Sequence, residues 1–453
     1  MKKEMKILSC TGIVGYGFPE ESFFAGVAQK PDLIACDAGS TDPGPYYLGA
    51  GIPFTNATAV KRDMTLMLKA ARELDIPLVI GTCGGAGANP HLMREVGILK
   101  EIAKENNLSF KLAVITSEFE KEYLVEALHA GKMAKLGPAP EITEEEILAS
   151  THIVAQMGVE PIIDALDNGA QVVLTGRCYD PAAFAAPAIR LGYDKALALH
   201  LGKILECAAI CATPGSGSDC IMGYLGEDYF KVEPLNPIRS CTPLSVSAHT
   251  LYEKTNPYLL PGPGGTLDLR GCDFVQDGER ACKVTGTKLI PADPYTVKLE
   301  GTKLAGYRTI AIAGIQDPQT IARIDWIFAG VQKFVAENTA GRYTAADYTL
   351  SLRKYGTPIP GTEAPTVPNC TLGVVLDAVA KTQDIADEIM ALARARMLHY
   401  DYPGRKSTAG NLAFPYSPSD IHLGAVYTFS IYHLMEVDSL TETSRIVYEE
   451  VGQ

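Results

Sequence analysis

The sequence predicts an α/β fold, with a parallel sheet flanked by helices in the N-terminal half and a smaller mixed α+β domain after it. In the first half, short apolar segments alternate with segments of helical periodicity. Each apolar segment ends in small or polar residues, as buried parallel strands do. From about Phe230, period-two alternation and turn residues replace this rhythm. We therefore expect an α/β domain over 1–230 that carries the main site loops, and a mixed domain with antiparallel strands over 231–453.

The strands and helices of the first half can be assigned in chain order. The apolar runs predict five strands, at residues 6–10, 33–37, 77–83, 111–118 and 171–176. Helical spacing predicts helices at 59–75, 93–107, 141–158 and 193–210. Strand, helix and strand at these lengths imply right-handed crossovers and a parallel sheet.

The second half contains different elements. Alternation and turn residues over 265–286 and 295–315 predict antiparallel hairpins. A helix is expected at 383–398, and a late strand at 425–437. The proline-rich stretch at 355–370 reads as a connector or surface loop.

Composition limits the class of protein. The chain has 453 residues, of which 47% are hydrophobic and 21% charged, typical of a globular protein with substantial cores. A net charge of -13 disfavours nucleic acid and acidic membrane surfaces as partners. The first 18 residues do not read as a signal peptide, and no segment has transmembrane character. Eleven cysteines without a signal peptide favour reduced thiols and a cytoplasmic location.

The first polar loop follows the strand that ends at Asp37. The stretch IACDAGSTDPGPYYLG places carboxylates, hydroxyls and tyrosines where ligands bind in open α/β sheets, at the carboxyl edge. Its candidate site residues are Asp37, Ser40, Thr41, Asp42 and Tyr46. Two interpretations of Asp37 remain open, a working carboxylate or a brace that hydrogen-bonds neighbouring amides.

A glycine-rich turn follows the third strand. The stretch GTCGGAGANPHL lets backbone amides approach an anion beside a helix N-terminus. It matches neither the dinucleotide fingerprint nor the Walker loop, so an anion-binding turn and a tight structural turn are both open. Its candidates are Gly84, Gly85, Gly87, Asn89 and His91.

A third loop, TGRCYDPA, combines Arg177, Tyr179 and Asp180. Arg177 either grips a substrate carboxylate or phosphate through a bidentate contact, or pairs with Asp180.

A fourth polar cluster is HLGKILECAAICATPGSGSDC. Cys207 and Cys211 would share a helix face, which indicates two packing residues more than a metal site, because no third and fourth ligand follow. Further candidates for substrate binding lie in this loop and beyond it: Ser216, Ser218, Asp219, Arg239 and His249.

The chain resembles the acyclic terpene utilisation (AtuA-like) family from about residue 6 to 435. The resemblance is carried by ILSCTGIVGYGFPEESF, CDAGSTDPGPYYLG, CGGAGANPHL, GRCYDPAAFAA, PLNPIRSCTP and GNLAFPYSPSDI. It implies catabolism of branched terpenoid acids or other organic acids, processed as coenzyme A thioesters, and in some members a small companion protein.

These residues together predict a lyase, hydratase or isomerase of a small or branched carboxylic acid or its acyl-CoA ester. Arg177 and the glycine turn would hold the anionic group of this small-molecule substrate, and Asp37 or His91 would move the proton, with Asp180 beside them. Tyr46 or Tyr179 would support the oxyanion. A divalent metal on Asp37, Asp42 or Asp180 is an open alternative, and no other cofactor is expected. We expect a homo-oligomer, with or without a small companion subunit.

Two hypotheses from other classes stay open. The motif DAGST after a strand is similar to the phosphate loop of the actin and sugar-kinase superfamily, which would make the protein an ATP-dependent enzyme. Against it, Pro43 and Pro45 interrupt the hairpin that such loops continue into. The other hypothesis is a non-catalytic subunit that completes the site of a partner enzyme.

Overall fold

The computed structural model describes residues 4–252, 255–356, 371–405, 411–438 and 444–452. Residue contacts divide the chain into unit 1, Met1–Lys303 with Phe429–Gln453, and unit 2, Leu304–Thr428. The boundary predicted near residue 230 falls inside a strand of unit 1. From residue 357 onward, the proline-rich stretch lies outside the described residues.

Unit 1 is built on a ten-stranded sheet with the order β12-β13-β9-β8-β1-β2-β3-β7-β4-β19. Five neighbouring strands run parallel and correspond to the five predicted ones: β1 (Met5–Ser9), β2 (Leu33–Asp37), β3 (Leu78–Gly81), β7 (Val172–Thr175) and β4 (Phe110–Thr116). Antiparallel strands extend both sides: β8 (Ile221–Leu225), β9 (Tyr229–Pro234), β12 (Asp273–Asp277), β13 (Ala281–Thr285) and β19 (Arg445–Val451). The predicted parallel sheet is confirmed, as is a hairpin, β12–β13, within 265–286.

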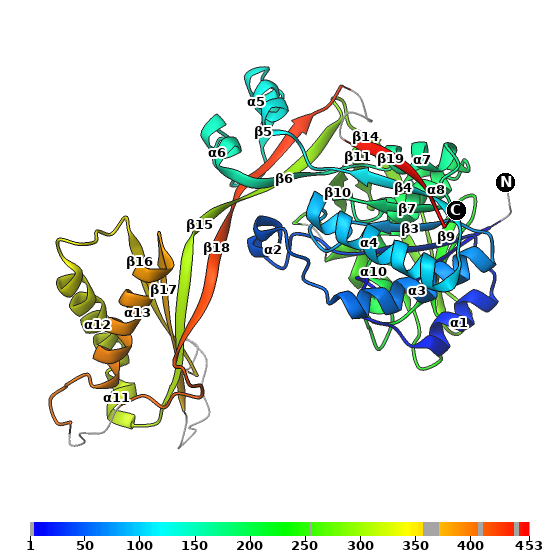
Figure 1. The fold of residues 1–453 in the computed structure, drawn as a ribbon. Helices are drawn as coiled ribbons and strands as arrows, with labels where there is room; N and C mark the ends of the chain where they lie inside the picture. Colours follow the sequence, from blue (N-terminus) through cyan, green and yellow to red (C-terminus); the bar gives the residue numbers. More distant parts are fainter. Residues whose placement is uncertain (1–3, 253–254, 357–370, 406–410, 439–443, 453) are drawn as a thin grey trace. The chain divides into compact units, whose positions relative to one another are not determined.

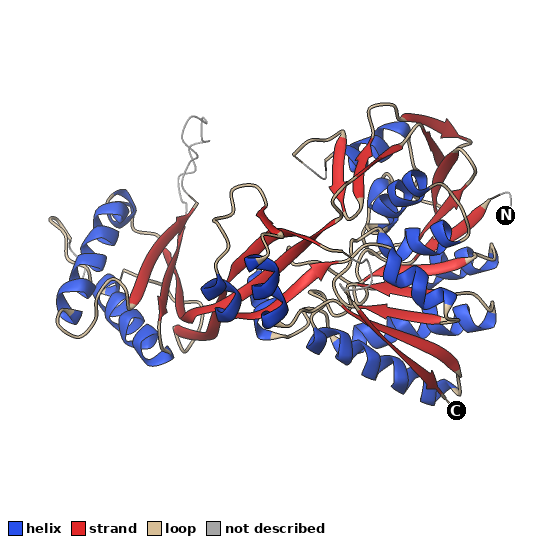
Figure 2. Ribbon diagram, turned by 90° about the horizontal axis from the view of Figure 1, so that it is seen from above, coloured by secondary structure: helices blue, strands red, loops and turns tan. Residues whose placement is uncertain are grey.

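Helices cover both faces of this sheet (Figures 1 and 2). One face packs against α1 (Glu20–Ala28), α3 (Ala57–Glu73) and α4 (Asn89–Asn106), and the other against α7 (Glu160–Asp167), α8 (Ala182–Arg190) and α9 (Lys195–Leu205). Successive strand residues face opposite cores: Ile7 and Leu33 lie in one, Leu8 and Ile34 in the other. Burial on both faces explains why these strands read as continuous apolar runs.

The remaining elements of unit 1 are shorter. The helical ones are α2 (Pro45–Ala50), α5 (Lys121–His129), α6 (Glu144–Ala149), α10 (Pro243–Leu251) and the 3-10 turn η1 (Ala208–Cys211). The strands are β5 (Met133–Lys135), β6 (Ser150–Gln156), and a small antiparallel sheet of β10 (Leu259–Gly262), β11 (Gly265–Asp268) and β14 (Lys288–Pro291).

Two predicted helices need correction. The helix expected over 141–158 is wrong beyond α6, because the β-branched residues that follow form β6, which pairs antiparallel with β15. The helix expected over 193–210 ends with α9 at Leu205, and Ala208 has a φ of 50°. Cys207 and Cys211 therefore do not share one helix face.

The hairpin predicted over 295–315 is also wrong, because this segment is a single strand, β15 (Thr296–Ile315), 20 residues long. The glycines that suggested turns have other roles. At Gly301 an added Cβ would lie 2.9 Å from Cβ of Ile431, and at Gly306 2.5 Å from the carbonyl oxygen of Ala380. Glycine is thus required for close approach of neighbouring chain segments.

Unit 2 combines a sheet with two packed helices. Its strands are β16 (Tyr348–Tyr355), β17 (Leu372–Ala380) and parts of β15 and β18 (Asp420–Glu436), which both cross the boundary between the units. Helices α12 (Ile324–Thr339) and α13 (Gln383–Leu398) share a core with β17, and α11 (Pro318–Ala322) precedes them. The expected helix at 383–398 and late strand at 425–437 are confirmed, as is the mixed α+β character. None of the helices in the described ranges has an apolar stretch long enough to cross a membrane.

Candidate functional site

A cavity of about 210 Å³ lies at the carboxyl edge of the parallel strands in unit 1. The loops after β2 and β7, which we expected at one edge, both contribute to it. Its lining comes from five segments: Gly12, Ile13 and Tyr16 after β1; Asp37, Gly39, Ser40 and Asp42 after β2; Asp180 after β7; Glu206, Cys207, Ile210 and Gly217 after α9; and Tyr252 after α10.

Asp37 is the last residue of β2 and is only 6% exposed. No described group donates a hydrogen bond to its Oδ1 atom. Burial, reinforced by the charges of Asp180 and Glu206, raises the pKa of Asp37 well above its usual range, and Arg177 offsets only part of this rise. A backbone hydrogen bond from Ala38 also acts to lower this pKa, so the working-carboxylate and brace interpretations of Asp37 both stay predictions.

A chain of ion pairs lies beside Asp37. Asp180 Oδ1 is 2.8 Å from Arg177 Nη1, and Asp180 Oδ2 is 3.7 Å from Lys203 Nζ. Lys203 in turn pairs with Glu206. Burial alone would raise the pKa of Asp180, but the charges of Arg177 and Lys203 outweigh it and lower the pKa to about 2.

Glu300 on β15 ties two of the site loops together. Its Oε2 accepts a hydrogen bond from Arg177 Nε at 2.7 Å, and its Oε1 accepts one from Thr41 Oγ1 at 3.0 Å. Lys298 Nζ lies 2.7 Å from the same Oε1 atom. Burial acts to raise the pKa of Glu300, but Arg177 and Lys298 lower it to about 2. This role of Glu300 is not predictable from the sequence, because Glu300 lies in the segment for which a hairpin is expected.

Counting the charges explains why Asp37 differs from its neighbours. Four carboxyl groups, on Asp37, Asp180, Glu206 and Glu300, lie with three cations, on Arg177, Lys203 and Lys298. Asp180 and Glu300 have direct cationic partners and stay ionised. The environment thus separates the pKa values of Asp37 and Asp180, a pattern typical of acid/base sites.

Arg177 is fully engaged within the protein. Besides Glu300 and Asp180, its Nη1 donates to the carbonyl oxygen of Cys178 at 2.8 Å, and its side chain is 3% exposed. The structure therefore matches the alternative in which Arg177 pairs with Asp180. Glu300 is a second carboxylate partner of the same guanidinium. Among described residues, no lysine or arginine lines the cavity.

The glycine turn after β3 is packed tightly against the site loops. A Cβ at Gly39 would lie 2.4 Å from Cα of Gly85, and one at Gly87, whose φ is 71°, would lie 2.2 Å from the backbone nitrogen of Arg177. At Gly84, a Cβ would lie 2.7 Å from Cβ of His91. These contacts support the structural interpretation of the turn, which brings the loops after β2 and β7 together.

Several predicted catalytic residues lie away from the cavity lining. His91 is buried on α4 with Nε2 3.1 Å from the carbonyl oxygen of Tyr47, and burial lowers its pKa to about 4. Tyr46 is 41% exposed on α2. Tyr179 is buried in the core shared with α7, α8 and α9. The backbone nitrogen of Asn89 donates to Glu118 at 2.7 Å.

The predicted binding residues beyond α9 contact different neighbouring groups of the protein. Asp219 is buried and pairs with Arg239 Nε at 2.7 Å. Burial opposes this ionisation, but hydrogen bonds led by Arg239 lower the pKa of Asp219. Ser216 Oγ accepts from the backbone nitrogen of Ser218 at 3.2 Å. His249 is buried on α10 and packs against Tyr252, which itself lines the cavity.

The metal and nucleotide alternatives can be compared with this geometry. Asp37, Asp42 and Asp180 all line the cavity, but in the described part of the chain no group of three or more His, Cys, Asp and Glu side chains is arranged to hold a metal ion. The DAGST loop leads into α2 and not into a hairpin. Without a cation in the described lining, the cavity is poorly suited to a triphosphate.

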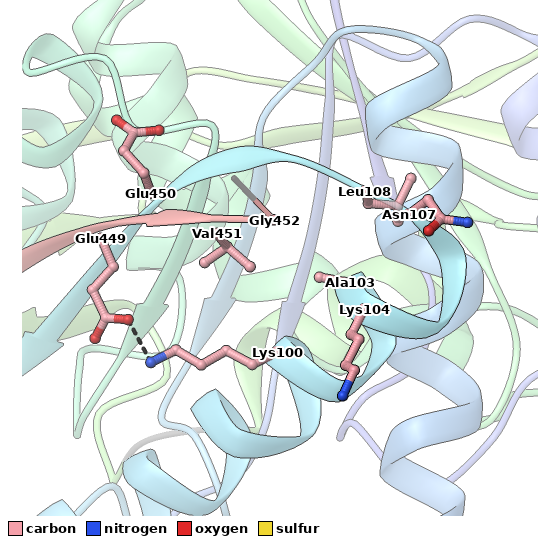
Figure 3. Close-up of a pocket in the computed structure, with 9 residues that line it drawn as sticks. All are labelled: Lys100, Ala103, Lys104, Asn107, Leu108, Glu449, Glu450, Val451 and Gly452. Atoms are coloured by element: carbon pink, nitrogen blue, oxygen red, sulfur yellow. Dashed lines mark ion pairs between the residues drawn. The ribbon is translucent and has the colours of Figure 1, made fainter.

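A larger hollow of about 580 Å³ lies between α4 and β19 (Figure 3). Its charged lining residues are two lysines and two glutamates, and Lys100 pairs with Glu449. Lys100 and Glu449 are partly exposed to solvent, where an ion pair contributes little to stability. The smaller cavity at Asp37 is therefore the candidate active site.

Comparison with known proteins gave one finding. The model of the family described as "Acyclic terpene utilisation family protein AtuA" matches residues 56–219 and 239–411, well over half of the chain. No match was found among curated proteins or among solved structures.

The glycine turn gives a first prediction. Gly87→Ala should lower the free energy of unfolding by about 3 kcal/mol, since it combines a left-handed backbone with a backbone clash. Gly131→Ala is the matched control, because Gly131 has a φ of 72° and nothing within 4 Å of an added Cβ. It should lose only about 1 kcal/mol. Urea unfolding measures both, and equal losses would contradict the packing role of Gly87.

A second prediction concerns Asp37 and pH. Because folding raises its pKa, the stabilising contribution of Asp37 is complete below the ordinary value of 3.8 and is lost as the pH rises through the raised value. Asparagine at this position cannot ionise, so the Asp37→Asn variant does not lose this stability as the pH rises. It should therefore match the parent in urea unfolding near pH 4 and be equally or more stable at pH 8. A clear loss of stability at pH 8 would restore the brace interpretation.

Asp180 should show the opposite dependence. Its pKa is lowered to about 2, so its stabilising contribution is present above 3.8 and is lost as the pH falls toward 2. Asp180→Asn removes a carboxylate that Arg177 and Lys203 share, and should cost about 3 kcal/mol at pH 8. Urea unfolding across pH measures the difference. An Asp180→Asn protein as stable as the parent at pH 8 would contradict the ion-pair chain.

Proposed function

The chain belongs to the acyclic terpene utilisation family AtuA, and on this premise we propose that it is an enzyme that moves a proton on a branched acyl group carried as a thioester. Family membership implies involvement in acyclic terpene catabolism. The reaction type, a lyase, hydratase or isomerase step that begins with proton transfer, is our inference from the cavity at Asp37.

One observation supports the proposal most strongly. Asp37 is a buried carboxyl group at the cavity, without a described hydrogen-bond donor at Oδ1, among carboxylates that cations keep ionised. A raised pKa brings a carboxyl group closer to neutral pH, where it can both accept and return a proton efficiently. Asp180, with its lowered pKa, keeps its charge and would not compete for that proton.

The proposed step is proton transfer at the carbon next to the thioester carbonyl. Ionised Asp37 takes the α-proton, and the electrons of the C–H bond move toward the carbonyl oxygen. Ser40 lines the cavity, and its Oγ accepts from the backbone nitrogen of Asp42 at 3.2 Å, so its own hydrogen can point to that oxygen. If Asp37 returns the proton to the same or another carbon, the result is isomerase chemistry. If Asp37 gives it to the oxygen of a β-hydroxyl group, the C–O bond breaks, water leaves and the electrons of the enolate form a double bond, which is lyase chemistry.

The charge of the lining favours a thioester over a free acid. The described lining includes the carboxyl groups of Asp37, Asp42, Asp180 and Glu206 and no lysine or arginine. A substrate carboxylate at the reacting end would face like charges, whereas a thioester carbonyl is neutral. Arg177, expected to hold an anion, instead keeps Asp180 and Glu300 ionised. We therefore assign Arg177 a positioning role.

The rest of the lining suits a hydrocarbon. Ile13, Tyr16, Ile210 and Tyr252 add apolar surface to the lining. A volume of about 210 Å³ is below the roughly 300–1,000 Å³ of pockets that hold whole drug-sized ligands. The cavity therefore fits the reacting end of a branched acyl group, and the carrier would remain outside it.

Hydrogen exchange tests this function without knowledge of the net reaction. We predict that the parent protein, incubated in D₂O with isovaleryl-CoA, catalyses deuterium uptake at the α-carbon, measured by mass spectrometry of the thioester. Asp37→Asn should reduce the rate by roughly 100- to 10,000-fold, because the amide cannot accept the proton.

Two comparisons make the exchange experiment decisive. Asp167→Asn, at a solvent-exposed ion pair on α7, should exchange at the parent rate. Free isovalerate should exchange far more slowly than its thioester. Exchange by Asp37→Asn at the parent rate would reject Asp37 as the proton carrier. Stabilisation by ATP and magnesium, with no response to any acyl-CoA ester, would favour the ATP-dependent alternative.

A further inference from the structure

Strand β19 forms one edge of the ten-stranded sheet. It pairs with β4 over all seven of its residues, and no strand among the described residues pairs with its other side. Val447 and Tyr448 on this edge are 39% and 37% exposed. Natural edge strands are usually protected by charged side chains, proline or a bulge. The sequence RIVYEEV contains no proline and its register with β4 is unbroken, so its protection comes from the charges of Arg445, Glu449 and Glu450.

The two faces of β19 are clearly distinguished. Glu449 points toward Lys100 of α4, and Glu450 points to the opposite side of the strand (Figure 3). Ile446 packs against the core on the face away from α4. Since side chains alternate along a strand, Arg445, Val447 and Glu449 share one face, and Ile446, Tyr448 and Glu450 share the other.

This edge is complementary to itself in one antiparallel register. A two-fold axis perpendicular to the sheet pairs residues that lie on the same face. With the axis at Val447, Arg445 faces Glu449 of a second copy, and Ile446 faces Tyr448 of that copy, each pair occurring twice. Opposite charges and aromatic–aliphatic pairs stabilise neighbouring strands. With the axis at Tyr448, Val447 would face Glu449 and Ile446 would face Glu450, which is far less favourable.

We propose that β19 is a homodimer interface, in which two copies of the chain join their sheets by antiparallel pairing of β19 about an axis at Val447. Such pairing satisfies the outward backbone groups of both edges. No residue of β19 lines the cavity at Asp37, so this inference does not depend on the proposed function.

A cysteine at the axis tests the geometry directly. Paired Cα atoms in antiparallel strands lie about 4.5–5.5 Å apart, within the range of a disulfide. Val447→Cys should therefore form a covalent dimer under mild oxidation, seen on a non-reducing gel. The control is Val275→Cys on β12, the opposite edge of the same sheet, where Val275 is 57% exposed. No cross-link, or equal cross-linking in the control, would overturn the proposal.

A charge reversal tests the register in solution. The parent protein should have twice the chain mass of 48.5 kDa by light scattering at micromolar concentration. Arg445→Glu places two pairs of glutamates opposite each other and should weaken the dimer by roughly tenfold or more. The double variant Arg445→Glu, Glu449→Arg restores both pairs and should restore the dimer. Glu449→Arg also replaces the partly exposed pair with Lys100 by two like charges, a change at an exposed site that has a small effect on stability.

Circular dichroism and urea unfolding of each variant separate loss of the dimer from loss of folding. A parent protein that stays monomeric, or a folded double variant that stays as dissociated as Arg445→Glu, would overturn the proposal.

Discussion

The candidate site depends on the buried guanidinium of Arg177. It is the only described group that contacts both Asp180 and Glu300, at 2.8 and 2.7 Å, and it does so from the loop after β7. Bringing several carboxylates into a protein interior is unfavourable unless each finds a cation and hydrogen bonds. Arg177 meets this requirement for two carboxylates at once and fixes their positions through its planar fork. The loops that carry Asp180 and Thr41 are held in place as a consequence.

The same pairing explains how one carboxyl group comes to differ from the rest. Asp180 and Glu206 share Lys203, and Glu300 shares Arg177 with Asp180, so the nearby cations already have anionic partners. The negative charges of Asp180 and Glu206 act to raise the pKa of Asp37. Unlike Asp180 and Glu206, Asp37 makes no ion pair with Arg177 or Lys203. The raised pKa of Asp37 follows from this arrangement, and carboxyl groups with raised pKa values are found preferentially at functional sites.

The sequence allowed prediction of features that depend on local pattern. The five parallel strands were assigned because burial on both faces makes each a continuous apolar run, and the strand-end rule then placed Asp37 and Asp180 at one edge. Features that depend on distant pairing were not predictable. Glu300 is 123 residues from Arg177, on a strand whose glycines mimicked turns. Likewise, the segment of β6 has helical spacing when it is considered alone, and its strand conformation depends on antiparallel pairing with the distant strand β15.

The glycine turn connects the fold to the polarity of the cavity. Glycines after a strand are a common signal for anion binding, and here they would have favoured an anionic substrate. Gly85 and Gly87 allow the backbones of Gly39 and Arg177 to approach, which supports the structural interpretation of this turn. Arg177 is paired with Asp180 and Glu300, and neither Arg177 nor the glycines of the turn are among the described residues that line the cavity. This lack of a described cation in the lining is the reason why we propose a substrate with a neutral carbonyl group beside Asp37.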